Sequence, residues 1–574
     1  MTDSKNSHDS DIHEIIQDTD HDEYLVCGIN GLNAQRQGLA PMSADQMVGL
    51  KNFLDDSNDI EVIKSYRPKK PRFNASSAFG SSETQEHHVV RMNSRKAEEL
   101  KQSGRGNIIV GKNLPLTYEQ GYIWYPSTTP TQVYNPQTYP QYALNVQPDA
   151  TVAPRATKPV PHPVRLGSLP EAKIQFSVLG VDNKPVEGAT VTLQGSVLPQ
   201  TGKTNKKGEL TLSVILHPGQ SPEFIQVSNV ANCWDFYLRR PKLTNGEVNI
   251  IRLTPLSETI PDFETAFRFG WGQCLMGLDK SESIPSAEGI KIAIVDSGTD
   301  NSHPLLSHIQ QGEDLSGSGS GGWHDDELGH GTHVSGVISA NGKDGKMQGF
   351  APKAEIHSLK IFPGGNLSTL IEALDYCIDN NIDVVNLSLG TNQSSDAFTA
   401  VEQKIEEAAH AGVACIVAAG NNGGAVQYPA SSPNTLAVAA LGKLGEFPKI
   451  SWNQDTIQEE LVSPHGLFSP SYTSMGPEVA VAAPGSAIIS TWPGNSFAPD
   501  SGTSMAAPHI TGLAANILAS QPEFKNELEA RNADRVKRLF DLIGAAACPI
   551  PEFGRDRTGL GMPTLQSFIP TLPY

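Results

Sequence analysis

KIAIVDSGTD (residues 291–300) is the stretch of sequence that decides the fold of the larger part of this chain. Four consecutive apolar residues lead into Asp296, which is typical of a strand buried on both faces of a sheet. Similar apolar runs follow downstream: EIHSLKIF, DVVNLSLG, VACIVAAG and TLAVAAL. Helical patterns alternate with them, and we expect Ser368 and Asp396 to cap two of these helices. This alternation predicts an α/β fold, a parallel sheet with helices on both faces.

Three polar motifs follow elements of this predicted sheet. Asp296 comes directly after a buried strand, and GHGTHVSG (329–336) places His330 at a glycine-flanked helix start. SGTSMAAPH (501–509) places Ser504 at the mouth of another helix, with a proline in its early turns. Peptide hydrolysis by serine needs a base for the hydroxyl proton and a carboxylate to orient that base. These residue types therefore indicate nucleophilic catalysis.

Donors for a developing oxyanion are also available. A serine at a helix N-terminus lies beside exposed backbone N–H groups, which favour negative charge. VAAGNNGG (417–424) ends a strand at Asn421, whose side-chain amide can supply a second donor.

The motifs DSGTD, GHGTHVSG, NLSLG, AAGNNG and SGTSMAAPH resemble those of the subtilisin family in order and separation. The resemblance covers about residues 262–574, including the closing GLGMPTLQSF. It implies a serine endopeptidase that works through an acyl-enzyme intermediate. The implied roles are orientation by Asp296, acid–base catalysis by His330, nucleophilic attack by Ser504 and oxyanion stabilisation by Asn421.

The same resemblance implies a substrate cleft for an extended peptide. Two short segments with mostly small side chains form its walls and leave backbone groups free to pair with a substrate strand. A further residue falls near the base of the specificity pocket. These positions are Ser388, Leu389 and Gly390, then Ala418, Ala419 and Gly420, and finally Gln427. None carries a fixed charge, so we expect neither strictly basic nor strictly acidic cleavage sites.

Each candidate has an ordinary alternative role. A single Asp after a strand is usually a turn residue, and a single Ser at a helix start is usually an N-cap. His333 is expected to brace its helix rather than to act in catalysis. For the whole chain, the alternative is a catalytically silent binding protein that uses a β-sandwich. A protease dedicated to one partner is a third possibility that sequence cannot rank.

A metal site is not expected, and neither is any cofactor. In DSGTDNSHPLL, Leu305 stands where the family resemblance leads one to expect a calcium-binding carboxylate. A leucine side chain supplies no oxygen ligand, which calcium requires.

The N-terminal part, residues 23–118, shows the order strand, helix, strand, strand, helix, strand. Its end, from NSRKAEELKQSG to LPLTY, resembles the inhibitor-like prodomain of subtilisins. That resemblance implies that the chain's own prodomain inhibits the enzyme and is removed by autocatalytic cleavage. We expect the cut near Tyr118.

The remaining segments differ in composition. Residues 1–22 form an acidic tail that we expect to be disordered, and residues 119–168 form a Pro/Tyr-rich linker. Residues 169–256 alternate turns with short strands, which predicts a small β-sandwich. DNKPVEGATVTL with NKKGELTLSV resembles transthyretin-like domains. The peptidase domain is expected over 262–574.

Composition limits the partners. The net charge of −19 over 574 residues argues against nucleic acid, because such binding needs clustered Lys and Arg. Proteins or peptides are the expected substrates. The six cysteines show no disulfide or zinc spacing, and Cys27, Cys377 and Cys415 lie in apolar runs typical of a core. Without a signal pattern or an apolar run of about 20 residues, we expect no membrane partner and a cytoplasmic location, unless export is unconventional.

Overall fold

The computed structural model describes nine stretches of the chain: 21–29, 42–69, 86–104, 106–118, 171–196, 198–216, 220–280, 286–317 and 321–567. The chain divides into two compact units. One is Met1–Leu114 with Gln393–Gln403, and the other is Pro115–Asn392 with Lys404–Tyr574. The tail predicted over 1–22 lies outside the described residues except for its last two, which begin a strand. The linker predicted over 119–168 also lies outside them.

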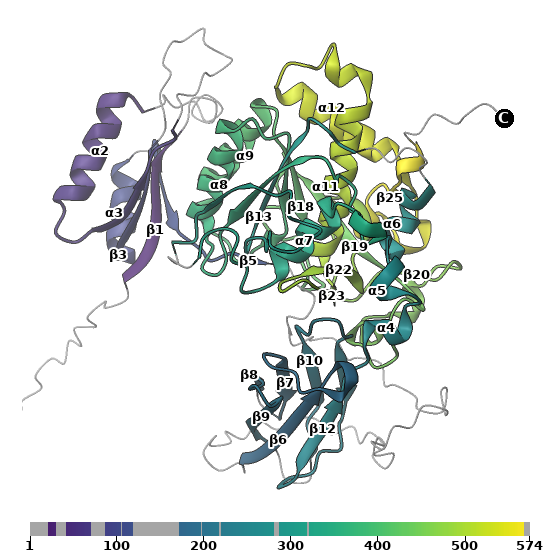
Figure 1. Cartoon of the computed structure of the whole chain (residues 1–574). Helices are drawn as coiled ribbons and strands as arrows, with labels where there is room; N and C mark the ends of the chain where they lie inside the picture. Colours follow the sequence, from purple (N-terminus) through teal and green to yellow (C-terminus); the bar gives the residue numbers. More distant parts are fainter. Residues whose placement is uncertain are drawn as a thin grey trace, which may run out of the picture. The chain divides into compact units, whose positions relative to one another are not determined.

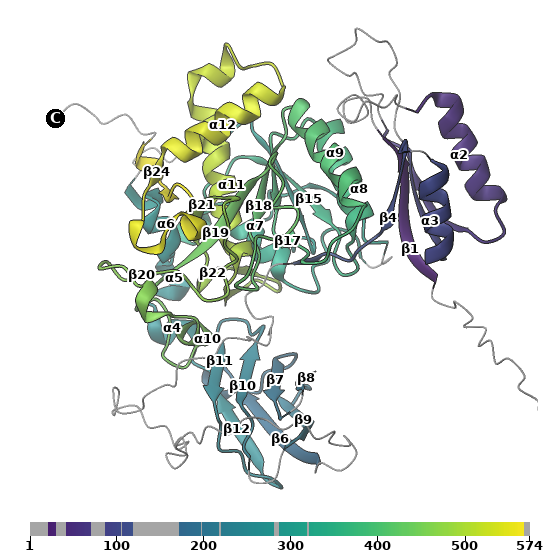
Figure 2. The ribbon, with the colours of Figure 1, turned by 180° about the vertical axis from the view of Figure 1, so that it is seen from behind.

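The smaller unit is built on an antiparallel sheet with the strand order β2-β3-β1-β4. Helices α2 and α3 lie on one face of this sheet (Figures 1 and 2). Ser43 caps α2 and Asn93 caps α3, each accepting a hydrogen bond from the first turn. The elements are β1 (His21–Gly28), α2 (Ala44–Asp56), β2 (Glu61–Tyr66), β3 (His87–Asn93), α3 (Ser94–Ser103) and β4 (Ile108–Lys112).

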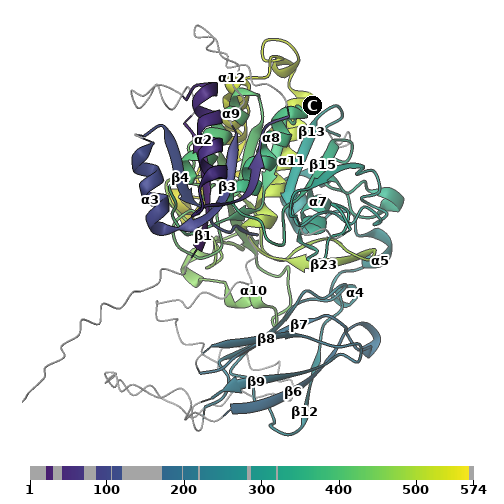
Figure 3. The ribbon, with the colours of Figure 1, turned by 90° about the vertical axis from the view of Figure 1, so that its left-hand side faces the viewer.

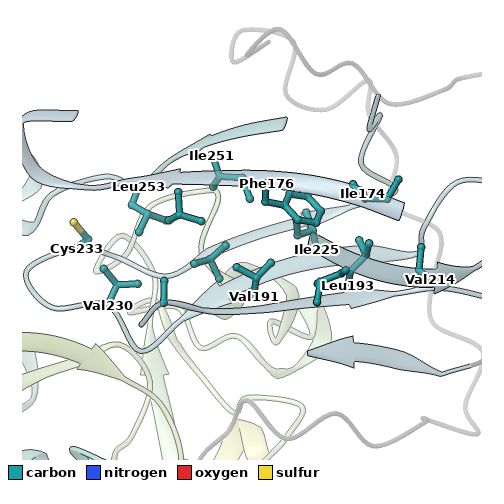
Figure 4. Packing of buried hydrophobic residues seen from close by; sticks show 14 residues of the cluster. Ile174, Phe176, Val191, Leu193, Val214, Ile225, Val230, Cys233, Ile251 and Leu253 are labelled. Atoms are coloured by element: carbon teal, nitrogen blue, oxygen red, sulfur yellow. The ribbon is translucent and has the colours of Figure 1, made fainter. Parts of the chain in front are cut away.

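Within the larger unit, the strands from β6 to β12 form two sheets that pack face to face (Figure 3). The sheet orders are β11-β10-β7-β8 and β12-β6-β9. Phe176, Val191, Leu193 and Ile225 point between the sheets and are almost fully buried (Figure 4). The strands are β6 (Glu171–Leu179), β7 (Thr190–Gln194), β8 (Pro199–Lys203), β9 (Glu209–Ile215), β10 (Phe224–Ser228), β11 (Phe236–Arg239) and β12 (Val248–Arg252).

The predicted parallel sheet is confirmed. Its main order is β14-β15-β13-β16-β18-β19-β20, with β21 also paired to β19, and β20 is the antiparallel member. Its strands are β13 (Lys291–Asp296), β14 (Gln311–Asp314), β15 (Glu355–Lys360), β16 (Val384–Leu387), β18 (Ala414–Ala418), β19 (Leu436–Lys443), β20 (Leu467–Phe468) and β21 (Val479–Pro484).

Helices cover both faces of this sheet, with α8 and α9 on one side and α7 and α11 on the other (Figure 1). α7 packs against α11, and α11 packs along β16, β18 and β19. The long helices are α7 (His330–Ser339), α8 (Leu367–Asp379), α9 (Phe398–His410), α11 (Thr503–Ser520) and α12 (Ala533–Ala545).

Short elements complete the larger unit. The short helices are α4 (Leu256–Thr259), α5 (Phe263–Ala266), α6 (Trp271–Leu275), α10 (Trp452–Asp455) and α13 (Arg555–Thr558). The two-stranded pairs are β5 (Thr117–Tyr118) with β17 (Leu389–Gly390), β22 (Ile488–Trp492) with β23 (Ser496–Asp500), and β24 (Ala547–Cys548) with β25 (Met562–Pro563).

The cap predicted for the helix at 367 was wrong. Asn366, not Ser368, caps α8, and its side chain accepts from the backbone N–H of Thr369. Ser368 lies in the first turn and donates its hydroxyl proton to Oδ1 of Asn366. Because both residues are good caps and lie only two positions apart, the pattern alone cannot choose between them.

The burial of Cys27, Cys377 and Cys415 is confirmed, and none of the three forms a disulfide. Across the described parts of the chain, no helix combines the length and the apolar character that a membrane span requires.

Candidate active site

Asp296 and His330 lie side by side at the ends of β13 and α7. Asp296 is the last residue of β13, and His330 is the first residue of α7, directly after Gly329. Gly329 has a φ of 79°, which glycine adopts at little cost and which turns the chain sharply into the helix. Nδ1 of His330 donates to Oδ1 of Asp296 at 2.7 Å, with both side chains buried. The proton on Nδ1 leaves Nε2 as the basic nitrogen.

The electrostatics favour His330 as a base. Burial disfavours its charged form, but the charge of Asp296 and its hydrogen bond outweigh that cost, so the pKa of His330 is raised. Among the described residues, Nε2 of His330 has no hydrogen-bond partner. This nitrogen is therefore available for a proton.

Asp326 fixes the start of α7 and was not predicted from the sequence. Its Oδ2 accepts from the backbone N–H and the hydroxyl of Thr332, at 2.8 and 2.6 Å. Its Oδ1 accepts from the N–H of Gly329 at 2.9 Å. Burial raises the pKa of this carboxyl, and the Thr332 donors oppose that effect. The DDELGHGTH stretch gave only the ordinary signal of an acidic residue near a helix N-terminus.

Ser504 is the second residue of α11, in the first turn, where a helix leaves backbone N–H groups without a partner inside the helix. Its Oγ donates to the carbonyl oxygen of Ser388 at 3.2 Å, and the Ser388 hydroxyl donates to the carbonyl oxygen of Ser504 at 2.9 Å. Nδ2 of Asn386 in turn donates to the Ser388 hydroxyl at 2.9 Å. These bonds fix the N-terminus of α11 to the chain just after β16.

The side-chain amide of Asn421 has a fixed orientation. Its Oδ1 accepts from the backbone N–H of Thr503 at 2.9 Å and from the Thr503 hydroxyl at 3.0 Å. The Nδ2 group is buried and has no hydrogen-bond partner among the described residues. An unpaired buried donor is costly, and it becomes useful when a ligand oxygen pairs with it. Through its Oδ1, the Asn421 side chain is bonded to Thr503, the residue directly before Ser504.

A segment of the chain itself, residues 115–118, is paired with the backbone close to these residues. Thr117 and Tyr118 pair antiparallel with Gly390 and Leu389, and the hydroxyl of Thr117 donates to the carbonyl oxygen of Gly390. The N–H of Leu116 donates to the carbonyl oxygen of Gly365 at 2.8 Å on the opposite side. The segment therefore lies as an added strand between two backbone edges.

Tyr118 ends this segment against the imidazole of His330. The two ring centroids are 4.9 Å apart, and the ring of Phe362 lies 5.7 Å from Tyr118. Burial, followed by the charges of Asp500 and Asp296, raises the pKa of the Tyr118 phenol. Phe362 was not predicted because its KIFPGG context is that of an ordinary strand end.

The other predicted wall residues adjoin Asn421. The N–H of Gln427 donates to the carbonyl oxygen of Ala419 at 2.9 Å, and the N–H of Gly420 donates to the Thr503 hydroxyl at 3.1 Å. Gly420 has a φ of 115°, and a Cβ there would come within 2.6 Å of Cγ of Gln427. Ala418 is the buried last residue of β18. Gln427 thus lies against the segment that leads to Asn421.

His333 and Leu305 contribute to the core around the site. Nε2 of His333 contacts the carbonyl oxygens of Ile488 and Ala498 at 2.8 and 3.1 Å. Burial lowers the pKa of His333 to about 3, so it stays neutral and braces α7. Leu305 is buried in an apolar cluster with two neighbours, Ala340 and Met347.

Comparison with known proteins identifies the family of this chain. Residues 287–539 match the subtilase family of peptidases. Subtilisin of Bacillus pumilus is 34% identical over 269 residues, which cover 46% of this chain and 87% of that protein. The chain belongs to the subtilase family.

Coverage differs among the relatives. Subtilisin NAT of Bacillus subtilis subsp. natto is 34% identical over 267 residues, 45% of this chain and 62% of that protein, so less than two thirds of that relative is spanned. Among solved structures, a chain titled S41 Psychrophilic Protease is 28% identical and has a TM-score of 0.43. That alignment covers 53% of this chain and all of the other.

Proposed function

We propose that this chain is a serine endopeptidase in which Asp296, His330 and Ser504 act as a catalytic triad. The observation that carries the proposal is the 2.7 Å pairing of Asp296 with His330, together with the open Nε2 of that imidazole. Ser504 supports it by its place in the first turn of α11. Proteins or peptides are the substrates.

The reaction has two halves. Oγ of Ser504 bonds to the carbonyl carbon of the scissile peptide while its proton passes to Nε2 of His330. The C–N bond then breaks as His330 returns the proton to the leaving amine, which leaves an acyl-enzyme. Water attacks the acyl group by the same proton route, and the product carboxylic acid leaves Ser504 regenerated.

The oxyanion formed in each half is stabilised by Nδ2 of Asn421 and by backbone N–H groups at the start of α11. The bonds from Thr503 to Oδ1 fix the orientation of the Asn421 amide and leave Nδ2 as the unpaired donor. Such fixed donors need no reorganisation as charge develops.

We further propose that the chain processes itself. The segment 115–118 already lies as a paired strand, with Thr117 and Tyr118 opposite Gly390 and Leu389. Tyr118 is paired with Leu389, the residue after Ser388, and the carbonyl oxygen of Ser388 accepts from Oγ of Ser504 at 3.2 Å. This register supports cleavage near Tyr118. The released N-terminal fragment then acts as an inhibitor, because its tail is preorganised as a paired strand.

Labelling with a fluorophosphonate probe tests the proposed activity. The wild-type chain should take up one probe, and peptide mapping should place it on Ser504, because only an activated serine reacts at a useful rate. Ser504→Ala should not be labelled. A folded wild-type chain that stays unlabelled would instead favour the catalytically silent binding protein.

A further inference from the structure

A polar cluster is one of the contacts between the β-sandwich and the peptidase part of the same unit. The carboxylate of Asp235, at the start of β11, is buried and accepts from the hydroxyl of Ser451 at 2.7 Å. Its other oxygen accepts from the backbone N–H of Trp452 at 2.6 Å. Nearby, Arg239 makes a two-pronged ion pair with Asp455. The sandwich is therefore joined to α10 and its N-cap by charge-assisted bonds, which are stronger than neutral ones.

From Ser451 the hydrogen bonds continue to the loop that carries the nucleophile. Nδ2 of Asn453 donates to the Ser451 hydroxyl at 3.0 Å, and Oδ1 of Asn453 accepts from the Ser501 hydroxyl at 2.8 Å. Ser501 also accepts from the N–H of Ala487 at 2.8 Å. Ser501 lies three residues before Ser504, directly before the first turn of α11. A continuous chain of side chains thus joins Asp235 to the nucleophile loop.

All the donors in this chain point the same way. The hydroxyl of Ser501 donates to Asn453, Asn453 donates to Ser451, and Ser451 donates to the carboxylate of Asp235. Ser451, Asn453 and Ser501 are buried, so each bond polarises the next in a medium of low dielectric constant. Burial raises the pKa of Asp235 to about 6, so the carboxylate is ionised at neutral pH and can only accept. Its charge therefore fixes which way the amide of Asn453 points.

A second contact from the sandwich reaches the same loop by its backbone. The N–H of Asn232 donates to the carbonyl oxygen of Phe497, and the N–H of Phe497 donates to Oδ1 of Asn232, at 2.6 and 3.0 Å. Phe497 is in β23, which runs directly into Ser501. The indole of Trp234 is buried in the same apolar cluster as Ile489 of β22. Both contacts of the sandwich, through Asp235 and through Asn232, therefore lead to residues 496–504, which include Ser504.

We propose that Asp235 is a positioning residue for Ser504, which it reaches through Ser451, Asn453 and Ser501. The β-sandwich is then part of the catalytic unit. This inference rests on the proposed protease function for its kinetic effect, whereas the positioning itself can be measured without activity.

The kinetic test compares Asp235→Asn with Asp182→Asn, the same substitution at an exposed position of the sandwich. An amide at 235 offers a donor where Ser451 and Trp452 both need an acceptor. We expect kcat to fall about 10- to 100-fold, the scale of a misplaced reacting group, with KM little changed. Asp182→Asn should match the wild type. A loss confined to KM, or an equal loss in both variants, would overturn the proposal.

Coupling is tested with Ser501→Ala, which removes the far end of the chain without altering the sandwich. Asp235 and Ser501 do not contact each other, so independent effects would multiply in the double variant. We expect the kcat of the double variant to be no lower than the kcat of the less active single variant. Multiplying losses would contradict a shared chain. If Asp235→Asn fails to fold, Ser501→Ala still tests whether breaking this chain of hydrogen bonds lowers kcat.

Hydrogen–deuterium exchange in the Ser504→Ala background separates positioning from activity. Peptides covering 497–505 should exchange faster when Asp235→Asn is added, and Asp182→Asn should leave them unchanged. Unchanged exchange at 497–505 in Asp235→Asn would refute the positioning role whatever the chain's activity. A wild-type chain that hydrolyses nothing, with faster exchange in Asp235→Asn, would refute only the protease function.

Discussion

The two ends of the candidate active site are held in place by different chemistry. At the His330 end the direct partners are carboxylates: Asp296 pairs with the imidazole, and Asp326 fixes the helix start with three bonds. At the Ser504 end the direct partners are neutral, namely the amide of Asn421 and the backbone and hydroxyl of Ser388.

The difference matches what each end has to do. A base that becomes a cation is stabilised by a nearby carboxylate, which raises its pKa. A serine that carries a developing oxyanion would be disfavoured by a carboxylate at the same distance, so it is fixed by amides and hydroxyls. Substitutions at the His330 end should therefore change the pH profile, and substitutions at the Ser504 end should change the rate alone.

Asp296→Asn should give the largest loss within this comparison. The amide donates where Nδ1 of His330 needs an acceptor, which favours the wrong tautomer, and the expected fall in kcat is about 10⁴-fold. Steady-state hydrolysis of a peptide substrate measures it. Asp300→Asn, whose carboxylate bonds Ser302 and Gly494 away from the imidazole, is the control and should stay near the wild type. A similar loss in both variants would contradict the assignment.

Asn421→Ala should lower kcat about 10²- to 10³-fold, the usual result of removing one oxyanion donor. KM should change little, because the donor acts on charge that develops during the reaction. The matched control is Asn422→Ala. Its side chain bonds Ser474 and Gly424 instead of the Ser504 loop. If Asn422→Ala proved the more damaging change, Asn421 would not be the donor.

The pH profile should distinguish the two ends. The pKa of His330 is raised above 6.5, the ordinary imidazole value, and the reaction needs neutral His330. Activity is therefore lost as pH falls through that raised pKa, so the acid limb of kcat/KM should lie above pH 6.5. Asp296→Asn should move the limb to lower pH, and Asn421→Ala should leave it in place. A limb below 6.5 in the wild type, or one that moves with Asn421, would contradict this division.

Chelation should have the smallest effect. Leu305 is packed against Ala340 and Met347, so the position offers no oxygen ligand for calcium. Excess chelator should lower the melting temperature by less than the roughly 2–4 °C that 1 kcal/mol produces in a domain of this size. Thermal unfolding with and without chelator measures this. A larger drop that calcium restores would reveal a site elsewhere in the chain.

Local patterns in the sequence predicted the sheet and its motifs well. The apolar run at 292–295 is a strand, because four consecutive apolar residues of this kind are buried when an extended segment is covered on both faces of a sheet. Gly329 beside His330 predicted the start of α7, and the SGTS sequence at 501–504 predicted the start of α11. These signals are local, so a single sequence carries them.

Contacts between distant residues could not be predicted. Asp235 is separated from Ser451 by 216 residues, and NCWDFYLRR gives no hint of a buried carboxylate. Asn366 and Ser368 compete as caps on equal terms, so only the folded chain decides between them. The inclusion of Gln393–Gln403 in the smaller unit likewise depends on tertiary packing.

Intact-mass analysis of the purified wild-type chain and of Ser504→Ala tests the central claim most directly. If Ser504 is the nucleophile and segment 115–118 lies beside it as a paired strand, the wild type should yield a fragment that ends near Tyr118. Ser504→Ala should stay full-length, because its nucleophilic oxygen is gone. The same fragment released at the same rate from Ser504→Ala would contradict the role of Ser504. A wild-type chain that stays full-length would contradict self-processing.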